Sequence, residues 1–492
     1  MTTLTSATGT ISSAGIGSGL DVNNIVTSLM NVEKQPLTRL QTRATTLQTK
    51  LSAFGQIKSI AAALQDAARP LYNTDSFSLS NASSSDATSV AATTTTKAVP
   101  GIYSLSVSSL SAAQSVVSAS GQFADSTAAV GTGSITLELG TWSTGQTAFT
   151  PKTGATAITI PIGASENTLA GVRDKINAAN AGVSAAIVTD ASGSRLSLQS
   201  SATGAANGFR VTVADDDLAN GDAAGLSRLA YDPAGGASQL TLAQSAANTQ
   251  ATINGIAVSS SSNTLDNVID GITFSLSKVT TQPVTVNVTR DTNAIKGKLA
   301  AFVAAYNTLN AVLSSATHYD PASKQAALLQ GDGTTTGMQN QLHSLLSASS
   351  PASATFQTLS AIGVRVQKDG SLTLDDATFA SAVAKLPELT KALSNVDAVN
   401  PANNGFGKRF AAWTDKLLAS DGSLSGKSTA LQSQLTANQK DQSALSDRLV
   451  LVEQRLRAQY TTLDSTMAKA NALSQYVTQQ FYTKSNSNTS NG

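Results

Sequence analysis

The C-terminal part of the chain carries a long heptad pattern, which restricts the possible folds more than any other feature. From Leu431 the positions 431, 435, 438, 442, 445, 449, 452, 456, 459 and 463 step by four and three residues, and most are Leu or Val. The pattern continues less strictly through Ala470, Val477 and Phe481. A helix from about Ser428 to Phe481 would be roughly 80 Å long, so it requires partner helices along its length.

The N-terminal part offers a matching helical pattern. Apolar residues recur at Ile25, Leu29 and Val32, following Asp21, which we expect to accept hydrogen bonds from the start of the helix. Pro36 fits the first turn of a second helix, with apolar positions at Leu37, Leu40, Ala44, Leu47, Leu51, Phe54, Ile57, Ile60 and Leu64. We therefore expect the two ends of the chain to pair as a coiled coil or helical bundle.

The middle of the chain, residues 76 to 290, has a different character. Ser and Thr become abundant, and apolar residues alternate with them in YSLSV, ITLEL, FRVTV, ITFSL and VTVNV. Such alternation predicts strands with one buried and one solvated face. We therefore predict an α+β multidomain protein in which β-rich head domains are inserted between the helical ends.

The β-rich part contains an internal repeat. The stretches ITIPIGASENTLAGVRDKI and ATINGIAVSSSSNTLDNVIDGI superpose at a constant offset of 96, with Ile160 on Ile256 and Asp174 on Asp270. Each copy is predicted to form a strand, a short helix capped by Asn or Thr, and a second strand. A single pair at this spacing favours two related subdomains over a solenoid.

After Arg290 the helical pattern returns, and VRVQKDGSLTL predicts a hairpin with a two-residue turn at Asp369-Gly370. These patterns divide the chain into six parts. We expect a disordered tail (1–20), a terminal coiled-coil leg (21–40 with 457–483), a helical bundle (41–75 with 291–456) carrying a β-hairpin near 362–374, a β-rich head domain (76–130 with 241–290), a second head domain inserted in the first (131–240), and a disordered tail (484–492).

Composition excludes several classes of protein. The formal net charge of +1 gives no electrostatic case for nucleic acid or an anionic membrane. The absence of cysteine removes disulfides and thiolate chemistry. No charged segment precedes an apolar run near the start, and nowhere do eighteen apolar residues run together, so we expect neither a cleaved signal nor membrane insertion. The chain either stays in the cytoplasm or leaves by a route that reads no such signal.

Two glycine-rich stretches look like nucleotide sites but have the wrong spacing. In GSLSGKS only three residues separate Gly422 from Gly426, where a phosphate loop needs four, and a helix rather than a strand precedes it. In GIGSGLD the glycines simply alternate, unlike a dinucleotide fingerprint. We expect a glycine-rich turn between two helices at the first stretch and a flexible linker at the second.

Other candidates for chemistry are equally weak. His318 and His343 are the only histidines, and neither lies beside carboxylates at metal-ligand spacing. Acidic runs at 215–217 and 375–376 fall where turns and helix starts are expected, so we interpret them as solvated or capping groups. Trp142 and Trp413 fit packing better than ligand stacking. We expect no catalytic residue, no metal site and no cofactor, and hence no enzyme.

The chain also contains, in order, six stretches that are typical of one family: GIGSGLDVNNIVTSLMNVEKQPLTRLQ, FVAAYNTLNAVL, LLQGDGTTTGMQNQLHSLL, LSAIGVRVQKDGSLTLDD, GFGKRFAAWTDKLLASDGSLSG and the heptad ending LSQYVTQQF. They resemble the bacterial flagellar filament cap proteins, also called hook-associated protein 2, and extend over nearly the whole chain. The two NTL repeats look like the insertion motif of flagellar hook and filament proteins.

This resemblance implies a structural and assembly role. Such a chain would be exported unfolded through the flagellar type III apparatus, without a cleaved signal, and would form a ring, commonly a pentamer, at the extracellular filament tip. Its heads would cover the central channel, so that flagellin folds and inserts beneath them. The implied partners are further copies of the chain, flagellin, the hook-filament junction protein and an export chaperone at the C-terminal helix.

The resemblance also assigns roles to residues. Partner contacts of the leg would fall at Asp21, Ile25, Leu29, Val32, Val477 and Phe481, and coiled-coil packing at Leu47, Leu51, Phe54, Leu445, Leu449, Val452 and Leu456. Two alternatives stay open: another axial protein, such as a flagellin or junction protein, and a nucleotide-binding protein using Gly422–Ser428. Adhesion of an exposed head to host glycans or mucus is an additional possibility.

Overall fold

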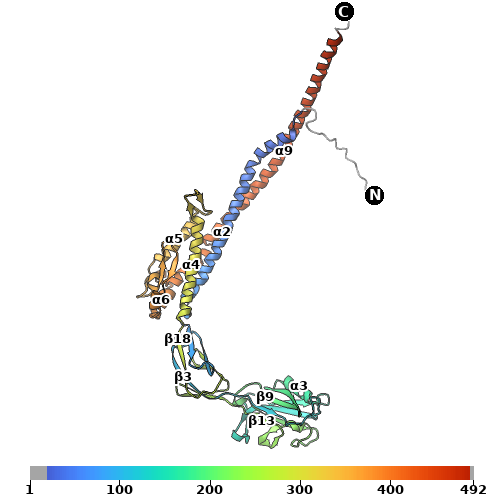
Figure 1. Ribbon diagram of the computed structural model, residues 1–492, viewed down its shortest axis with the longest axis vertical. Coiled ribbons are helices and arrows are strands. Elements are labelled where there is room, and N and C mark those ends of the chain that lie inside the picture. The colour runs from blue at the N-terminus through green and yellow to red at the C-terminus, as the bar shows by residue number, and fades with distance from the viewer. Residues whose placement is uncertain (1–18, 488–492) are drawn as a thin grey trace, which may run out of the picture. The chain divides into compact units, whose positions relative to one another are not determined.

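The computed structural model describes residues 19–487, except for the side chains of residues 483–487. The chain divides into two compact units (Figure 1). Unit 1 combines the residues up to Asn73 with those from Gly297 on, and unit 2 comprises Thr74–Lys296. Unit 1 is mainly helical and unit 2 is mainly β, so the predicted α+β multidomain class is confirmed. Most of the two expected tails lies outside the described residues.

The N-terminal helices of unit 1 begin where the sequence predicts. Helix α1 (Val22–Glu33) starts after Asp21, whose Oδ1 accepts a hydrogen bond from the Asn24 N–H at 3.0 Å. Helix α2 (Gln35–Tyr72) follows directly after Lys34, with Pro36 in its first turn. The two helices therefore meet at Lys34 without an intervening loop.

The C-terminal helix α9 (Ser423–Ser487) is 65 residues long and runs beside α2 (Figure 1). It begins earlier than the predicted Ser428, because Gly422 already ends the turn after the preceding helix. It also continues past Phe481, so residues 484–487, which we expected in a disordered tail, are helical. The distal part of α9 extends beyond α1 (Figure 1).

The rest of unit 1 packs around helix α4 (Thr292–Thr317). Its residues Phe302 and Tyr306 are buried, and both rings make edge contacts with Phe410. Burial raises the pKa of Tyr306 to about 12. Among the described helices, α4 alone is long and apolar enough to cross a bilayer by length and composition; here its apolar side chains form the core. The other elements are β19 (Tyr319–Asp320), β20 (Gln325–Ala326), α5 (Gly333–Ser347), β21 (Val364–Val366), β22 (Leu372–Leu374), α6 (Asp376–Val383), α7 (Leu386–Ser394) and α8 (Phe406–Leu418).

The predicted hairpin is present as β21 and β22, but its turn differs from the prediction. The Gln367 N–H donates to the Ser371 carbonyl, so Lys368, Asp369 and Gly370 all lie in the loop. Gly370 has φ of +78°, which is typical of a three-residue hairpin loop that ends in a left-handed residue. The sequence Asp-Gly marked the place of the turn but not its length.

The first and last strands of unit 2, β1 and β18, belong to one β-sandwich. A five-stranded sheet in the order β1-β18-β3-β14-β15 and a three-stranded sheet in the order β16-β17-β2 share one core, which includes Leu105, Phe274 and Val286. The segments YSLSV, ITFSL and VTVNV lie in strands, as predicted. The strands are β1 (Ser80–Ser84), β2 (Val90–Thr94), β3 (Gly101–Ser109), β14 (Thr249–Ile253), β15 (Ile256–Ser260), β16 (Thr264–Ile269), β17 (Ile272–Leu276) and β18 (Val284–Arg290).

A second core lies within the chain segment between these strands. A sheet in the order β12-β11-β10-β5-β6, with β7 also paired to β5, and a sheet in the order β13-β4-β9-β8 contribute to it together with helix α3. ITLEL and FRVTV lie in β5 and β10, as predicted. The elements are β4 (Ser115–Val117), β5 (Gly133–Trp142), β6 (Phe149–Pro151), β7 (Ile158–Ile162), α3 (Leu169–Ala179), β8 (Val183–Asp190), β9 (Gly193–Ser200), β10 (Gly208–Asp215), β11 (Tyr231–Asp232), β12 (Ala237–Ser238) and β13 (Thr241–Gln244).

The boundary between the two cores differs from the expected one. Val116, Phe123 and Val130 pack in the second core, although we had assigned residues 76–130 to the first head domain. The short strand β4 pairs with β9 and β13 and thereby attaches this part of the chain to the inserted domain. Periodicity within a segment does not reveal which sheet a three-residue strand joins.

The second copy of the predicted repeat folds differently from the first. In the first copy β7 is followed by α3, whose cap Thr168 accepts a hydrogen bond from the Gly171 N–H. In the second copy the corresponding segment is strand β16, paired with β17, and the predicted helix is wrong. Gly271, with φ of +76°, allows a tight turn directly after Asp270, at a place where the first copy has Lys175 and continues as helix. The two copies are therefore not two equivalent subdomains.

Candidate functional site

The part of unit 1 that contains the N-terminal helix is a helix pair made of α1 and the middle part of α9. Val22, Val26 and Met30 of α1 are buried against Leu449. Asn23 accepts a hydrogen bond through its Oδ1 from Arg457 at 3.0 Å, and Arg457 also pairs with Glu453. Leu20, Leu37, Leu445, Val452, Leu456 and Tyr460 pack partly buried against the same cluster.

The pairing of the chain ends is therefore shifted from the expected one. We expected residues 21–40 to pair with 457–483, whereas α1 packs on α9 between about residues 445 and 460. The N-terminal helices run antiparallel to α9, since Asn23 of α1 lies beside Arg457 and the later Leu40 of α2 lies beside the earlier Gln442. The part of α9 beyond Tyr460 consequently extends past the end of α1 (Figure 1).

The predicted contact residues of α1 lie off its buried stripe. Asp21 is exposed and caps the helix, Ile25 is half-buried, Leu29 is 38% exposed and Val32 is 62% exposed. Helix α1 thus has two apolar stripes, of which one packs on α9 and the other, from Ile25 to Val32, is only partly buried or exposed. Both stripes have helical spacing, so the sequence signal that identified Ile25 and Leu29 did not reveal that Val22, Val26 and Met30 form the buried side.

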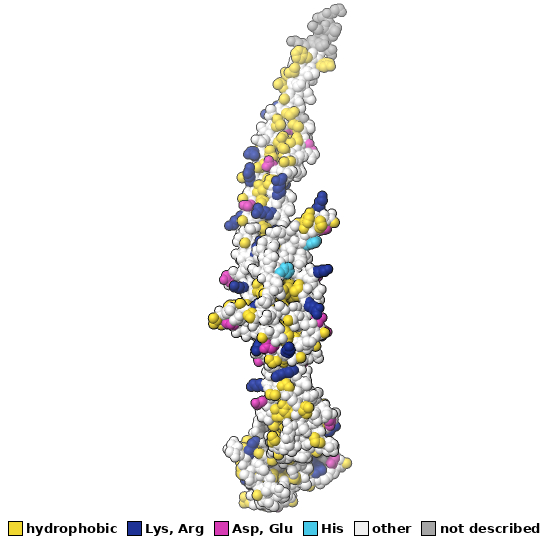
Figure 2. All heavy atoms as spheres, turned by 90° about the vertical axis from the view of Figure 1, so that its left-hand side faces the viewer, with side chains coloured by type: hydrophobic (Ala, Val, Ile, Leu, Met, Phe, Trp, Pro, Cys, Tyr) yellow, Lys and Arg dark blue, Asp and Glu magenta, His cyan; other side chains and the backbone are white. Residues whose placement is uncertain are grey.

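The distal part of α9 exposes a row of large apolar side chains (Figure 2). Val477 is 43% exposed and Phe481 is 70% exposed, and together with Thr478 and Tyr482 they line a shallow hollow of about 380 Å³. Large apolar patches of this kind mark interaction surfaces in soluble proteins. The exposed apolar residues of this part are Leu463, Met467, Leu473, Tyr476, Val477, Phe481 and Tyr482.

The predicted packing residues fall into two separate groups. Leu47 and Phe54 of α2 are buried and Leu51 is half-buried; they lie in the part of α2 that we assigned to the helical bundle. Phe54 has the Lys427 Nζ 5.7 Å from its ring centroid. The other four residues, Leu445, Leu449, Val452 and Leu456, pack against α1 instead.

A polar layer interrupts the apolar seam between α2 and α9. Asn438 is 3% exposed and accepts a hydrogen bond through its Oδ1 from Gln442 Nε2 at 2.6 Å. The same Nε2 lies 3.4 Å from the Leu40 carbonyl oxygen. Among the described residues, no hydrogen-bond partner faces Asn438 Nδ2. A buried polar residue at such a position costs stability and can fix the register of paired helices.

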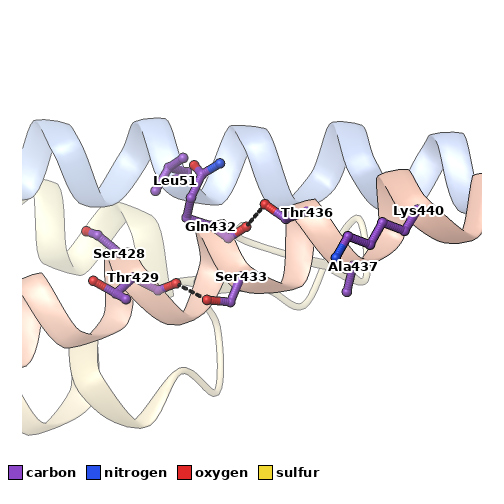
Figure 3. A pocket seen from close by; sticks show the side chains of 8 residues that line it. All are labelled: Leu51, Ser428, Thr429, Gln432, Ser433, Thr436, Ala437 and Lys440. Atoms are coloured by element: carbon purple, nitrogen blue, oxygen red, sulfur yellow. Dashed lines mark hydrogen bonds between the residues drawn. The ribbon is translucent and has the colours of Figure 1, made fainter.

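A groove of about 630 Å³ follows α9 beside Leu51 (Figure 3). Its hydroxyl groups are used within the helix, since Ser433 and Thr436 donate to the carbonyls of Thr429 and Gln432. No described acidic residue lines it. Lys440 is the one charged residue among the described residues that line the groove. Its lining is Leu51, Ser428, Thr429, Gln432, Ser433, Thr436, Ala437 and Lys440.

The stretch GSLSGKS contains no phosphate loop. The chain turns between Leu418 and Ser423, and Gly426 and Lys427 already lie in α9, so the predicted arrangement of helix, turn and helix is confirmed. Lys427 Nζ pairs with Asp332 Oδ2 at 2.6 Å. Burial alone would raise the pKa of Asp332, but the hydrogen bonds from Lys427 and from the N–H groups of Thr335 and Thr334 lower it below its usual value. The lysine that a nucleotide site would need is thus already paired within the fold.

The other candidate residues have structural roles. Asp375 caps α6 by accepting the Thr378 N–H. Asp215, which we expected to be solvated or capping, is buried and accepts the Ser227 N–H at 2.9 Å. Trp142 packs against Phe149, as predicted. Among residues 19–487 no group of three or more His, Asp or Glu side chains could hold a metal ion.

The chain has paired terminal helices with an exposed apolar end and a β-rich insertion, and its polar groups form helix caps and ion pairs. These features are typical of a structural protein that assembles with other subunits. Models of the flagellar hook-associated protein 2 N-terminus and C-terminus match residues 18–114 and 246–472, and the flagellin hook IN motif matches residues 148–202. The chain belongs to the flagellar hook-associated protein 2 family, which confirms the resemblance.

Relatives and solved structures agree with this assignment. Flagellar hook-associated protein 2 of Escherichia coli strain K12 is 33% identical, over 97% of this chain and 99% of the relative. The B-type flagellar hook-associated protein 2 of Pseudomonas aeruginosa PAO1 is 31% identical, over 92% and 94% of the two chains. The crystal structure of the flagellar cap protein FliD D1-D2-D3 domains from Escherichia coli superposes with a TM-score of 0.61 at 30% identity, over 77% of this chain and 99% of that one.

Proposed function

We propose that this protein forms the cap at the distal tip of the bacterial flagellar filament. In this role it retains exported flagellin and promotes its folding and polymerisation, so that the filament elongates. The observation that carries the proposal is the match along nearly the whole chain to flagellar hook-associated protein 2 of Escherichia coli, together with the match of 77% of the chain to the crystal structure of a flagellar cap protein. This match favours the interpretation as a cap protein. The alternatives, a flagellin, a junction protein or a nucleotide-binding protein, are less well supported.

The mechanism requires contacts and confinement but no covalent chemistry. The leg is the part that reaches the filament, through Asp21, Ile25, Leu29, Val32, Val477 and Phe481. Exposure of Leu29, Val32 and Phe481 supports this assignment, because burying such a side chain stabilises a complex by about 1.5–3 kcal/mol. An exposed row that the described chain leaves uncovered is available to a partner subunit.

The assembly and its location follow from the same role. Copies of the chain form a ring-shaped homo-oligomer, a pentamer, outside the cell at the filament tip, after export without a cleaved signal. The chain meets the hook-filament junction protein before the first flagellin is added, and before export its C-terminal helix is held by a chaperone. The exposed distal apolar residues of α9 support such a contact. The head domains are also available for adhesion.

A deletion strain tests the proposal. Without the protein, cells should release unpolymerised flagellin into the medium and carry no long filaments, and the full-length protein supplied from a plasmid should restore both properties. Electron microscopy of the cells and flagellin measurement in the medium give the two readouts. Filaments of ordinary length in the deletion strain would contradict the proposal. Long filaments formed by the purified protein alone would instead indicate a filament subunit.

A further inference from the structure

The outer side of α2 carries an uncompensated row of positive charge. Between Glu33 and Asp66 the sequence has basic residues but no acidic residue. Arg39, Arg43 and Lys50 are separated by four and by seven residues, which places them on one side of the helix. Arg39 and Arg43 are exposed and Lys50 is half-buried, and among the described residues none of the three forms an ion pair. Figure 2 shows Lys and Arg side chains gathered on the paired helices of unit 1.

Five exposed threonines lie on the same outer side of α2, next to this row. Each hydroxyl donates to the backbone carbonyl four residues earlier in the helix, so its hydrogen-bonding capacity as a donor is used locally. The methyl groups are left as the part that a partner can contact. Thr is a poor helix former, and the exposure of these residues shows that packing within the unit does not require them. They are Thr38, Thr42, Thr45, Thr46 and Thr49.

Together the threonines and the three cations define what we call the α2 face. Apart from the cations at its edge it consists of small side chains, and from Thr38 to Thr49 it spans about 18 Å. Such a face fits three turns of a partner helix that lies alongside it. The guanidinium groups of Arg39 and Arg43 suit carboxylates, which they bind through two parallel hydrogen bonds.

We infer that the α2 face binds an acidic helix of the protein subunits against which the leg stands, with small apolar residues on the threonine methyls and carboxylates on Arg39, Arg43 and Lys50. This inference rests on the proposed function, which places the leg against flagellin; the face begins in the leg at Thr38 and Arg39 and continues along the same helix α2. A membrane would require large apolar side chains on such a face, and the face has none. Nucleic acid would require a larger cationic surface or stacking aromatics, and α2 offers only three neighbouring cations there.

Charge removal tests the inference. The variant R39Q/R43Q/K50Q of the full-length protein is compared with K97Q/K278Q/K368Q, which removes the same charge from exposed lysines elsewhere. Binding is measured to filaments of the flagellin from the same bacterium over a range of salt concentrations. We expect the first variant to bind about tenfold more weakly at low salt and to lose most of its salt dependence. The control should bind as the unaltered protein does.

A second variant tests the threonine part of the face. T42Q/T46Q places long side chains on it while raising helix propensity, so weaker filament binding with an unchanged unfolding curve is expected.

Equal binding of filaments by the unaltered protein and by R39Q/R43Q/K50Q would overturn the inference but leave the proposed function standing. A lower oligomer mass for R39Q/R43Q/K50Q with unchanged filament binding would assign the face to a second copy and overturn it too. Tighter binding of the unaltered protein to a DNA duplex or to anionic vesicles than to filaments would also overturn it. If the unaltered protein fails to bind filaments, the proposed function fails as well.

Discussion

Lys427 Nζ lies 2.6 Å from Asp332 Oδ2, and this ion pair joins the start of α9 to the first turn of α5. The carboxylate also accepts the N–H groups of Thr334 and Thr335 through its other oxygen. The Lys427 ammonium lies 5.7 Å from the centroid of the Phe54 ring on α2. Lys427 thus connects the three helices α2, α5 and α9. It is the residue that would correspond to the phosphate-binding lysine if GSLSGKS were a phosphate loop.

The first prediction concerns this ion pair. Lys427→Met leaves the mostly buried Asp332 without its cation, and breaking buried pairs in this way is strongly destabilising. Because Lys427 is 29% exposed, we expect a somewhat smaller loss of about 2–4 kcal/mol in the free energy of unfolding. Urea unfolding measures it, with Lys440→Met as a control at an exposed position of the same helix. Equal stability of the two variants would contradict the role of the pair.

The pairing of Lys427 also bears on the alternative of a nucleotide site. Adding ATP should not raise the melting temperature of the unaltered protein.

A second prediction concerns pH. Hydrogen bonds from Lys391 and Ser353 lower the pKa of Glu388 from 4.5 to about 2. Since the folded state has the lower pKa, this group stabilises the fold fully above about pH 4.5, and the contribution is lost as the pH falls toward 2. Glu388→Gln should therefore flatten the fall in melting temperature over this range, whereas Asp447→Asn, at an exposed site, should not. Identical pH profiles for Glu388→Gln and the unaltered protein would refute this.

The two stripes of α1 give a third prediction. Leu29→Gln changes an exposed side chain, so it should impair filament capping in cells while leaving the unfolding curve nearly unchanged. Val26→Gln changes a fully buried side chain of the same helix and should destabilise the contact with α9 by about 2–4 kcal/mol. Swimming assays and protease sensitivity of α1 separate the two effects. If Leu29→Gln cells cap filaments normally, the outer stripe has no partner role.

The distal end of α9 gives a fourth prediction. Val477→Ser and Phe481→Ser remove exposed apolar contact area, so together they should weaken binding to filaments by at least about tenfold without changing the free energy of unfolding. Leu451→Ser is the matched control, because Leu451 is 65% exposed on the same helix. Sedimentation with purified filaments measures the binding. An effect of similar size from Leu451→Ser would show that exposed apolar area in general, rather than this end of the helix, matters.

The polar layer between α2 and α9 gives a fifth prediction. Asn438→Leu removes a buried amide whose Nδ2 has no hydrogen-bond partner in the described chain. Gln442 Nε2 loses the Asn438 Oδ1 acceptor but keeps the Leu40 carbonyl, so the free energy of unfolding should rise by about 1–2 kcal/mol. The same change should relax the register of the two helices. Because the chain has no cysteine, a Cys pair introduced at Leu51 of α2 and Gln432 of α9, which line the same groove, can report the register by cross-linking with a short bis-maleimide. A lower yield in the Asn438→Leu background supports the register role, and an unchanged yield contradicts it.

Much of the architecture could be predicted because it depends on local pattern. The heptad from Leu431 predicted a long helix in need of a partner, and Pro36 predicted where α2 begins, since proline at that place loses no hydrogen bond. Alternation of apolar residues with Ser and Thr predicted the strands of unit 2. The stretches that resemble the family predicted the assignment that the comparisons support.

The candidate site could be predicted only in part, because spacing gives a periodicity without an orientation. Val22, Val26 and Met30 have the same helical spacing as Ile25, Leu29 and Val32, and nothing in the sequence indicates which row faces α9. The offset of the helix pair also has no local signal: Asn23 meets Arg457, and any heptad register along α9 would have matched the apolar pattern equally well.

The sequence by itself determined that this chain pairs its two ends and carries β-rich domains between them, because helix and strand periodicity are properties of a single segment. Only the tertiary structure decided which stripe of α1 is buried, that β4 joins the inserted domain, that the second repeat turns at Gly271 instead of forming a helix, and that Lys427 pairs with Asp332. Each of these depends on the free energy of contacts between segments far apart in the chain, which no single segment encodes.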